Sequence, residues 1–290
     1  MRTGFGHTGH MAPSALLLLQ VVVIGVDGLS PAGIAKARAP HLDGLRARGA
    51  STMHARGVMP TSSSPNWASM IMGAGPEQHG VTSNDWEPDR FDIAPVFKGP
   101  GGIFPTVFGQ LRTQRPKTPI AVFHDWKGFA RLIEPGVPDI IEHVKGSAQT
   151  AAAAVRYLRQ NKPGLMFVHF DDVDHAGHEI GHGTPQYIAA IEEVDGLIGR
   201  ILEALAANGT LAATAVLVTA DHGGVGRKHG NATMAEIEIP WILAGPGVAK
   251  GRTIAGAVNT FDTAPTVARL LGIQAHPAWI GRPVAEAFEK

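Results

Sequence analysis

Short apolar runs alternate along the chain with segments whose apolar residues recur every three or four positions. The apolar runs predict strands over residues 20–26, 120–123, 165–170, 215–219 and 239–244. The helical spacing predicts helices over residues 39–50, 65–72, 105–113, 148–160, 185–207 and 263–271. Because strands and helices alternate, we expect an α/β fold with a mostly parallel central sheet and helices on both faces. The Pro- and Gly-rich stretch 86–119 breaks this alternation and predicts an irregular excursion rather than a second domain.

The chain begins with a Gly-, His- and Pro-rich stretch, residues 1–14, that has no periodicity. We interpret it as a disordered leader or an engineered remnant, followed by a single domain over residues 15–290. The apolar run 15–26 fits either a buried strand or the core of an export signal. The missing small-residue cleavage site before Asp27 favours the strand. The run is too short to cross a bilayer, which takes about 20 apolar residues, so no membrane span is expected.

Composition narrows the possible chemistry. The 25 Lys and Arg residues balance 25 Asp and Glu residues, so no bulk positive field favours a stable nucleic-acid complex or an anionic membrane. The chain has no cysteine, which excludes disulfides, thiolate metal sites and thiol catalysis. Any transition metal must therefore bind to His, Asp and Glu side chains.

Acidic and imidazole side chains follow three of the predicted strands. Each has an ordinary explanation on its own, as a turn or helix-capping residue. Because ligands of open α/β sheets bind at the carboxyl ends of strands, we expect these side chains to share one rim. They provide enough ligands for two divalent ions, with zinc favoured and manganese or another ion as alternatives. The set comprises Asp27 after the first strand, Asp174 and His178 after 165–170, and Asp221, His222 and His229 after 215–219.

A hydroxyl-rich turn, Thr61-Ser62-Ser63-Ser64, precedes the predicted helix 65–72. A serine at a helix N-terminus faces unpaired backbone N–H groups and the positive end of the helix dipole, where a phosphate binds well. A nearby metal would also make such a hydroxyl easier to ionise. On the local sequence alone, a plain Ser/Thr-rich loop with an ordinary N-cap is the simpler interpretation.

Five motifs in order resemble one known family. They are Val-Asp-Gly-Leu at 26–29, Ser-Ser-Pro-Asn-Trp-Ala-Ser-Met-Ile-Met-Gly at 63–73, Pro-Glu-Gln-His-Gly at 76–80 with Asn84, Asp-His-Ala-Gly-His at 174–178, and Ala-Asp-His-Gly at 220–223 with His229-Gly230. Their order and spacing resemble the alkaline phosphatase superfamily, and most closely its type I phosphodiesterase/nucleotide pyrophosphatase branch. The resemblance extends over about residues 20–271.

The resemblance implies a site for two divalent metal ions, with zinc as the expected metal. One ion would be held by Asp174, His178 and His229, and the other by Asp27, Asp221 and His222. Ser63 would bind to a metal through its hydroxyl and act as the nucleophile that forms a covalent phosphoseryl intermediate, with Ser62 and Ser64 as the neighbours it could be confused with. Asn84 and the amides at the helix start would stabilise the nonbridging oxygens of a small phosphate ester. The family is periplasmic or secreted, whereas a first run that is only a strand fits a cytoplasmic protein.

Departures from related branches favour a phosphodiesterase. The sulfatase branch has x-Pro-x-Arg after its nucleophile, but Asn66-Trp67 follows Pro65 here. The monoesterase branch binds the phosphate with an arginine near the nucleophile. Lys127 or Arg131 could take this role here, and a solvated basic pair fits the two residues at least as well. A phosphomonoesterase therefore remains the main alternative, ahead of a phosphonate or sulfate ester hydrolase, a phosphotransferase or mutase, and a silent anion-binding homologue. The short chain implies minimal cap insertions over the site.

Several other residues near these motifs have structural interpretations. We expect His79, His175 and His182 to support the site or the fold rather than bind the substrate. Four aromatic residues could line a pocket for the leaving group, but core or loop packing is the simpler interpretation. They are Trp86, Phe97, Trp126 and Phe129.

Overall fold

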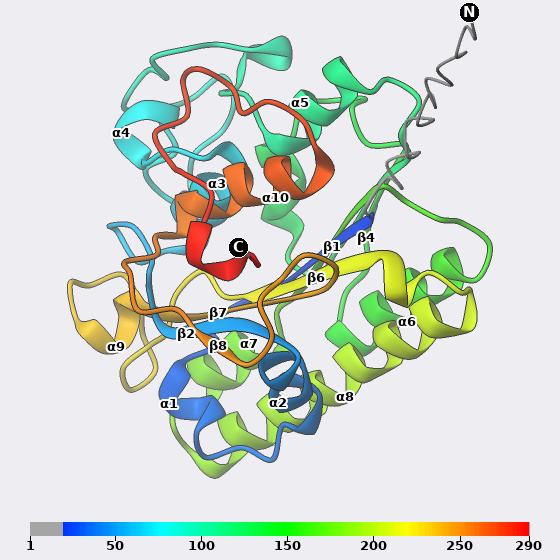
Figure 1. The fold of residues 1–290 in the computed structure, drawn as a ribbon. Helices are drawn as coiled ribbons and strands as arrows, with labels where there is room; N and C mark the ends of the chain where they lie inside the picture. Colours follow the sequence, from blue (N-terminus) through cyan, green and yellow to red (C-terminus); the bar gives the residue numbers. More distant parts are fainter. Residues whose placement is uncertain (1–19, 290) are drawn as a thin grey trace, which may run out of the picture.

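The computed structural model describes residues 20–289, and the expectations for residues 1–19 lie outside this range. One eight-stranded sheet organises the chain in the order β4-β3-β5-β1-β6-β7-β2-β8 (Figure 1). The strands are β1 (Gln20–Val26), β2 (Gly49–Arg56), β3 (Ile120–His124), β4 (Ile140–His143), β5 (Leu165–Phe170), β6 (Thr214–Thr219), β7 (Glu238–Ala244) and β8 (Arg252–Thr253). β7 is antiparallel to both of its neighbours, and all other pairings are parallel. The carboxyl ends of β1, β5 and β6 therefore lie side by side.

Helices cover both faces of the sheet. The α-helices are α1 (Pro31–Ile34), α2 (Pro40–Ala47), α3 (Ser63–Met72), α4 (Pro76–His79), α5 (Val107–Gln114), α6 (Ser147–Leu158), α7 (Asp172–Glu179), α8 (Pro185–Ala207), α9 (Met234–Ile237) and α10 (Thr263–Leu271). Short 3-10 turns include η1 (Pro100–Gly102), η2 (Lys127–Leu132), η3 (Leu211–Ala213), η4 (Thr260–Asp262) and η5 (Ala285–Ala287). Helices α3, α5 and α10 pack on one face, and α1, α2, α6, α7 and α8 lie on the other. The central strands are apolar on both sides because both faces are covered.

The predicted α/β architecture is confirmed, and each predicted strand is found within one residue of its expected bounds. The expected helix 39–50 is wrong at its end, because α2 stops at Ala47 and Gly49 begins β2. A Cβ atom on Gly49 would lie 2.1 Å from the carbonyl oxygen of Leu243, so glycine permits the close approach of β7. The apolar pattern misses β2 because its buried side chains are small, and it misses β4 because that strand is short and at the sheet edge.

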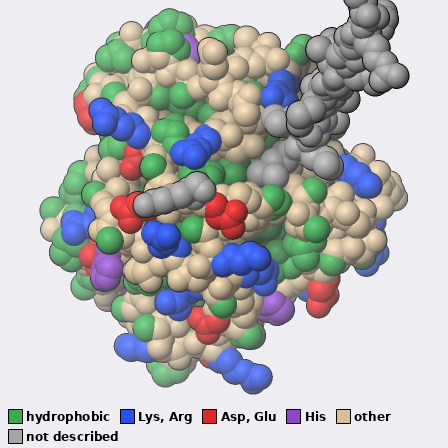
Figure 2. Space-filling model, in the orientation of Figure 1, with side chains coloured by type: hydrophobic (Ala, Val, Ile, Leu, Met, Phe, Trp, Pro, Cys, Tyr) green, Lys and Arg blue, Asp and Glu red, His purple; other side chains and the backbone are tan. Residues whose placement is uncertain are grey.

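The residues after β5 form helix α7, which was not among the predicted helices. Within the predicted excursion 86–119, the part before α5 is irregular and contains only η1 and one isolated bridge pair, Glu87 with Arg90, whereas residues 107–114 form the helix α5. Within residues 20–289, no helix has the length and apolar character needed to cross a membrane. Lys and Arg side chains are interspersed with Asp and Glu on the face shown in Figure 2, in keeping with the balanced charge.

Candidate active site

The acidic and imidazole side chains gather at the carboxyl ends of β1, β5 and β6. Asp27 directly follows β1, helix α7 follows β5, and Asp221 follows β6 after one residue. This rim is where open α/β sheets bind their ligands. The three carboxylates Asp27, Asp174 and Asp221 are all buried, with at most 8% of each residue exposed.

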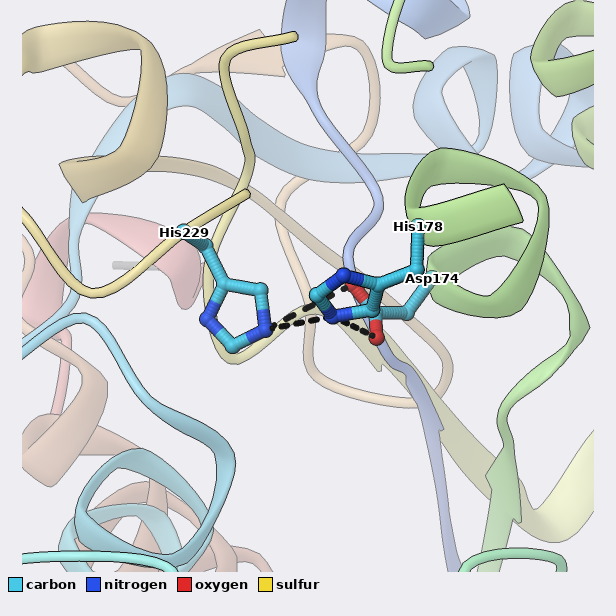
Figure 3. A group of neighbouring side chains, drawn as sticks. All are labelled: Asp174, His178 and His229. Atoms are coloured by element: carbon cyan, nitrogen blue, oxygen red, sulfur yellow. Dashed lines mark hydrogen bonds and ion pairs between the residues drawn. The ribbon is translucent and has the colours of Figure 1, made fainter. Parts of the chain in front are cut away.

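The first group consists of Asp174, His178 and His229. Helix α7 places Asp174 and His178 one turn apart on the same face, with His178 Nε2 at 3.2 Å from Asp174 Oδ2. The loop after β6 brings His229 Nε2 to 3.0 Å from His178 Nε2. Figure 3 shows the two imidazoles and the carboxylate pointing toward one another. One ligand atom from each residue lies within 4.8 Å of the other two, so the group could hold a metal ion.

The second group consists of Asp27, Asp221 and His222. His222 Nε2 is 3.1 Å from Asp221 Oδ2 and 3.4 Å from Asp27 Oδ1. All three side chains are buried, and their ligand atoms also lie within 4.8 Å of one another. Within residues 20–289, the oxygens Asp27 Oδ1 and Asp221 Oδ2, like Asp174 Oδ1 of the first group, are buried without a hydrogen-bond partner. Buried carboxylates at such close range repel one another, and a bound cation would relieve this repulsion.

The three imidazoles are oriented by backbone carbonyl groups. The Nδ1 atoms of His178, His222 and His229 lie 2.8–3.0 Å from the carbonyl oxygens of Arg227, Gly223 and Thr61, respectively. Each Nδ1–H therefore donates to the backbone and turns Nε2 toward the carboxylates. Metal-binding histidines are usually held in this way.

Asp27 is held from the opposite side. Its Oδ2 accepts a hydrogen bond from Trp67 Nε1 at 3.1 Å and lies 3.3 Å from His169 Nε2. Gly25 makes room for the indole, because a Cβ atom there would come within 2.5 Å of the Trp67 ring. Asp27, His169 and Asp171 also have metal-ligand spacing. Because Trp67 and His169 can both donate to Oδ2, we interpret this cluster as the support that leaves Asp27 Oδ1 free.

Trp67→Phe tests this support. The substitution removes one donor to Asp27, and we expect the affinity of the second group for a divalent metal ion such as zinc to fall about 10-fold, as for other residues that orient metal ligands. Competition with a chromophoric chelator would measure the affinity. Trp241→Phe is the matched control, because Trp241 is also fully buried and donates one hydrogen bond, to Thr263 Oγ1 at 3.2 Å. Equal loss of zinc affinity in both variants would contradict the support of Asp27 by Trp67.

The structure separates the three serines before α3. Ser63 Oγ lies 3.4 Å from His222 Nε2 and so faces the second group. Ser64 points elsewhere, with its Oγ at 3.1 Å from Arg131 Nη2. Ser62 is the N-cap residue, but its side chain makes no capping hydrogen bond. Of the three, Ser63 alone has its hydroxyl within hydrogen-bonding distance of a side chain of the two groups.

The N-terminus of α3 offers fewer free amides than expected. The Ser64 N–H donates to Asn84 Oδ1 at 2.8 Å, and Pro65 has no N–H. The Ser64 N–H is therefore not free to donate to a phosphate oxygen, contrary to the expectation for the amides at the start of this helix. Within residues 20–289, the Ser63 N–H and the side-chain Nδ2 of Asn84 have no hydrogen-bond acceptor, so both remain available.

Asn66, which belongs to the motif at residues 63–73, has a structural role that the motif alone does not indicate. It is fully buried, and its Oδ1 accepts from Val58 N at 2.7 Å. Its Nδ2 donates to the carbonyl oxygens of Val58, Pro60 and Ser62. Asn66 thus fixes the turn that presents Ser63. An asparagine one residue after a helix-start proline was the available signal, but its four partners are visible only in the fold.

The two candidate cations occupy different environments. Lys127 is exposed and makes no side-chain hydrogen bond or ion pair within the described part of the chain. Arg131 instead contacts Ser64, the Asn84 carbonyl oxygen and Glu87. The fold therefore brings Arg131, and not Lys127, against the start of α3.

The supporting histidines differ in their surroundings. His79 is buried, and its Nε2 lies 2.9 Å from Ser69 Oγ within the α3–α4 contact. His175 is exposed on α7. Both ring nitrogens of His182 are buried without a partner, and Nε2 lies 4.0 Å from Asp174 Oδ1. Of the four aromatic residues, Trp86 and Phe129 are buried in the core, Trp126 is partly buried against it, and Phe97 is exposed.

The electrostatics of the site predict a pH-dependent stability. Burial raises the pKa of Asp27 and of Asp221, and burial with repulsion from Asp27 raises the pKa of Asp171 to about 8. The hydrogen bond with Asp174 raises the pKa of His178 to about 9. A group whose pKa is higher in the folded state contributes stability at low pH that is lost as pH rises through that pKa. The buried histidines with lowered pKa values, such as His79, reduce the stability of the folded state only below about pH 6.5, where the same side chains are protonated in the unfolded state.

We therefore expect the Tm of the chelator-treated protein to fall between pH 7 and pH 9. If the site binds a divalent metal ion, the Tm of the protein incubated with zinc should fall less over this range, because the cation would compensate the carboxylate charges and stabilise the folded state that binds it. Thermal unfolding at pH 7, 8 and 9, with and without chelator, measures the difference. Parallel pH profiles for the two forms would contradict this electrostatic account.

Comparison with known proteins places the chain in a family. The family model for type I phosphodiesterase / nucleotide pyrophosphatase matches residues 21–99 and 112–235. Ectonucleotide pyrophosphatase/phosphodiesterase family member 1 of Homo sapiens is 24% identical over 196 residues, which cover 63% of this chain and 21% of the relative. A 2,3-bisphosphoglycerate-independent phosphoglycerate mutase of Haloarcula marismortui is 31% identical over 143 residues, covering 48% of this chain and 26% of the mutase. This chain thus spans about a fifth to a quarter of the length of these relatives.

A solved structure shows the same fold. It is the murine ectonucleotide pyrophosphatase / phosphodiesterase 5, an inactive variant in complex with AMP. The two structures superpose with a TM-score of 0.74 and 16% sequence identity, covering 89% of this chain and 96% of the other. The alkaline phosphatase-like fold is therefore confirmed, and the family model covers more than half of the chain. The chain belongs to the type I phosphodiesterase / nucleotide pyrophosphatase family of the alkaline phosphatase superfamily.

Proposed function

We propose that this chain is a zinc-dependent phosphoric ester hydrolase that prefers small phosphodiesters and acts through a phosphoseryl intermediate on Ser63. The observation that carries the proposal is the position of Ser63 Oγ, 3.4 Å from His222 Nε2, beside two groups of metal-ligand atoms. Family membership supports the reaction class. The substrate class follows from the site and from the relatives, whose names include phosphodiesterase and nucleotide pyrophosphatase.

The residues of the site fit two zinc ions. Three buried carboxylate oxygens have no hydrogen-bond partner, and three imidazoles turn Nε2 toward them. Nitrogen and carboxylate oxygen ligands without thiolate are typical of catalytic zinc sites. Asp174, His178 and His229 would hold one ion, and Asp27, Asp221 and His222 the other. When bound, such ions lower the pKa of a nearby hydroxyl and stabilise negative charge on a leaving oxygen.

The reaction proposed for this site transfers the phosphoryl group first to Ser63 and then to water. Ser63 Oγ loses its proton to water and attacks phosphorus, so that a P–Oγ bond forms while the opposite ester P–O bond breaks. The leaving alcohol takes its proton from water. A second water molecule attacks the phosphoseryl phosphorus, breaks the P–Oγ bond and restores Ser63. The free Nδ2 of Asn84 and the Ser63 N–H provide donors for the nonbridging oxygens.

One observation favours a diester over a monoester. A monoester is a dianion at neutral pH and gains most from an additional free cation beside the nucleophile. Arg131 is the cation that contacts the start of α3, and its charge is paired with Glu87 at 2.9 Å. Lys127 is exposed, and its side chain forms no hydrogen bond or ion pair within residues 20–289. The phosphomonoesterase alternative would need one of these cations to reorient.

The test measures the zinc content of the purified protein together with its rates of hydrolysis of a diester and a monoester. We expect purified protein to bind about two zinc ions per chain and to hydrolyse bis-p-nitrophenyl phosphate faster than p-nitrophenyl phosphate, with both activities lost on chelation and restored by zinc. Faster monoester hydrolysis would replace the diester preference by the phosphomonoesterase alternative. Zinc binding without turnover of either ester would contradict the proposed hydrolase activity on small esters, and absence of metal binding would overturn the site itself.

A further inference from the structure

Arg131 joins three segments that are far apart in the sequence. It lies in η2, and its Nη2 donates to Ser64 Oγ at 3.1 Å and to the carbonyl oxygen of Asn84. Its Nη1 forms an ion pair with Glu87 at 2.9 Å. The planar guanidinium group can satisfy such partners at once because its donors have fixed directions. Arg131 therefore ties the start of α3 to the segment that carries Asn84.

The surroundings of Arg131 restrict its other possible roles. About 20% of its side chain is exposed, and its guanidinium carbon lies 5.7 Å from the centroid of the Trp126 ring. Both terminal nitrogens are engaged with protein acceptors, and Glu87 balances the positive charge. A side chain held in this way is suited to fixing its partners and poorly suited to following a mobile phosphate group.

Asn84 is consequently held at two points. Arg131 fixes its backbone carbonyl group, and the Ser64 N–H fixes its side-chain Oδ1 at 2.8 Å. This double restraint also determines the side-chain orientation, because Oδ1 is occupied and Nδ2 is left as the free donor. A donor must be placed within a fraction of an ångström to stabilise developing charge, and a misplacement of about 1 Å can cost about 100-fold in rate.

We propose that Arg131 is a positioning residue that acts through Asn84, and that it does not bind the substrate phosphate itself. The inference rests on the proposed function, because Asn84 matters only if its Nδ2 meets the nonbridging oxygens. In the monoesterase interpretation, by contrast, Arg131 would bind the substrate phosphate directly. The two roles predict different coupling between Arg131 and Asn84 and different effects on diesters and monoesters.

A double-mutant cycle tests the proposal. Asn84→Ala should lower kcat for bis-p-nitrophenyl phosphate by about 100-fold, the scale of losing one transition-state donor. Arg131→Met should lower kcat by about 10-fold with little change in KM, because the metal groups and Ser63 remain. If Arg131 acts through Asn84, the double variant should be no slower than Asn84→Ala alone. Independent action would instead multiply the losses to about 1000-fold and would overturn the proposal.

Two further measurements keep the test decisive. Arg131→Lys retains the charge but cannot bridge Ser64 and Asn84, so it should lose rate in the wild-type background and lose nothing in the Asn84→Ala background. If Arg131→Met fails to fold, Arg131→Lys replaces it in the double-mutant cycle. A loss in Arg131→Met that is much larger for p-nitrophenyl phosphate than for the diester would show direct phosphate binding and overturn the proposal.

The wild-type control separates this inference from the proposed function. Diester hydrolysis that disappears in Ser63→Ala supports the hydrolase whatever the cycle gives. If Asn84→Ala then keeps the wild-type rate, the positioning role fails while the hydrolase stands. If the wild type hydrolyses neither ester, the proposed function fails, and the positioning role fails with it.

Discussion

Ser63→Ala should lower the rate of bis-p-nitrophenyl phosphate hydrolysis by about a thousand-fold or more, the scale seen when a catalytic nucleophile is removed. Ser63 Oγ faces His222 and the second ligand group, and no other hydroxyl of the turn occupies this position. Without Oγ no phosphoseryl bond can form, and the remaining side chains can only support direct attack by water. Steady-state kinetics with both esters would measure the loss.

The matched control is Ser62→Ala. Ser62 is the N-cap residue of α3, makes no side-chain capping hydrogen bond and differs from Ser63 by one position. We expect Ser62→Ala to keep the wild-type rate within a few-fold. Both Ser62→Ala and Ser63→Ala should still bind two zinc ions. A large loss in Ser62→Ala with a wild-type rate in Ser63→Ala would move the nucleophile by one residue and contradict the role of Ser63.

The strands and the rim could be predicted because they depend on local pattern and on a general property of sheets. β1, β5 and β6 are continuous apolar runs, and Asp27 and Asp221 follow such runs closely. Strands that are parallel bring their carboxyl ends to one edge, so the gathering of these side chains follows from the fold class. β2 was not predictable in the same way, because its buried side chains, such as Ala50, Thr52 and Ala55, are too small to form a recognisable apolar run.

The contacts that support the site depend on long-range packing. Trp67 reaches Asp27 only because Gly25 leaves space on β1 for its ring. The side chains of Arg131 and Ser64 meet across a separation of 67 residues, through the placement of η2 beside α3. No periodicity in the sequence encodes such distances. The helix α7, by contrast, could have been inferred from the four-residue spacing of Asp174 and His178.

Asp221→Asn should remove one zinc ion per chain and lower diester hydrolysis by more than about 100-fold, since direct ligands should cost more than the residues that orient them. Asp221 Oδ1 accepts hydrogen bonds from the backbone N–H groups of Gly28, at 3.2 Å, and His222, at 2.9 Å. An asparagine must keep its oxygen toward these two donors. Its NH2 group then replaces Oδ2, where it cannot bind a cation.

The same substitution should not damage the metal-free fold. Asp221 is fully buried, and burial together with repulsion from Asp174 raises its pKa. Removing this charge while keeping the shape relieves repulsion, so the chelated Asp221→Asn protein should have a Tm equal to or higher than that of the chelated wild type. The expected signature is a stable chain with one zinc ion and little activity.

Asp195→Asn is the matched control for a buried carboxylate outside the site. Asp195 accepts from the backbone N–H groups of His41 and Leu42 at the start of α2. Losing this charge at a helix N-terminus should lower the Tm and leave two zinc ions and full activity. Zinc content by atomic emission, the rate and the Tm together distinguish the two variants. If Asp221→Asn kept two zinc ions and the wild-type rate, Asp221 could not be a metal ligand, and the second group would have to be abandoned.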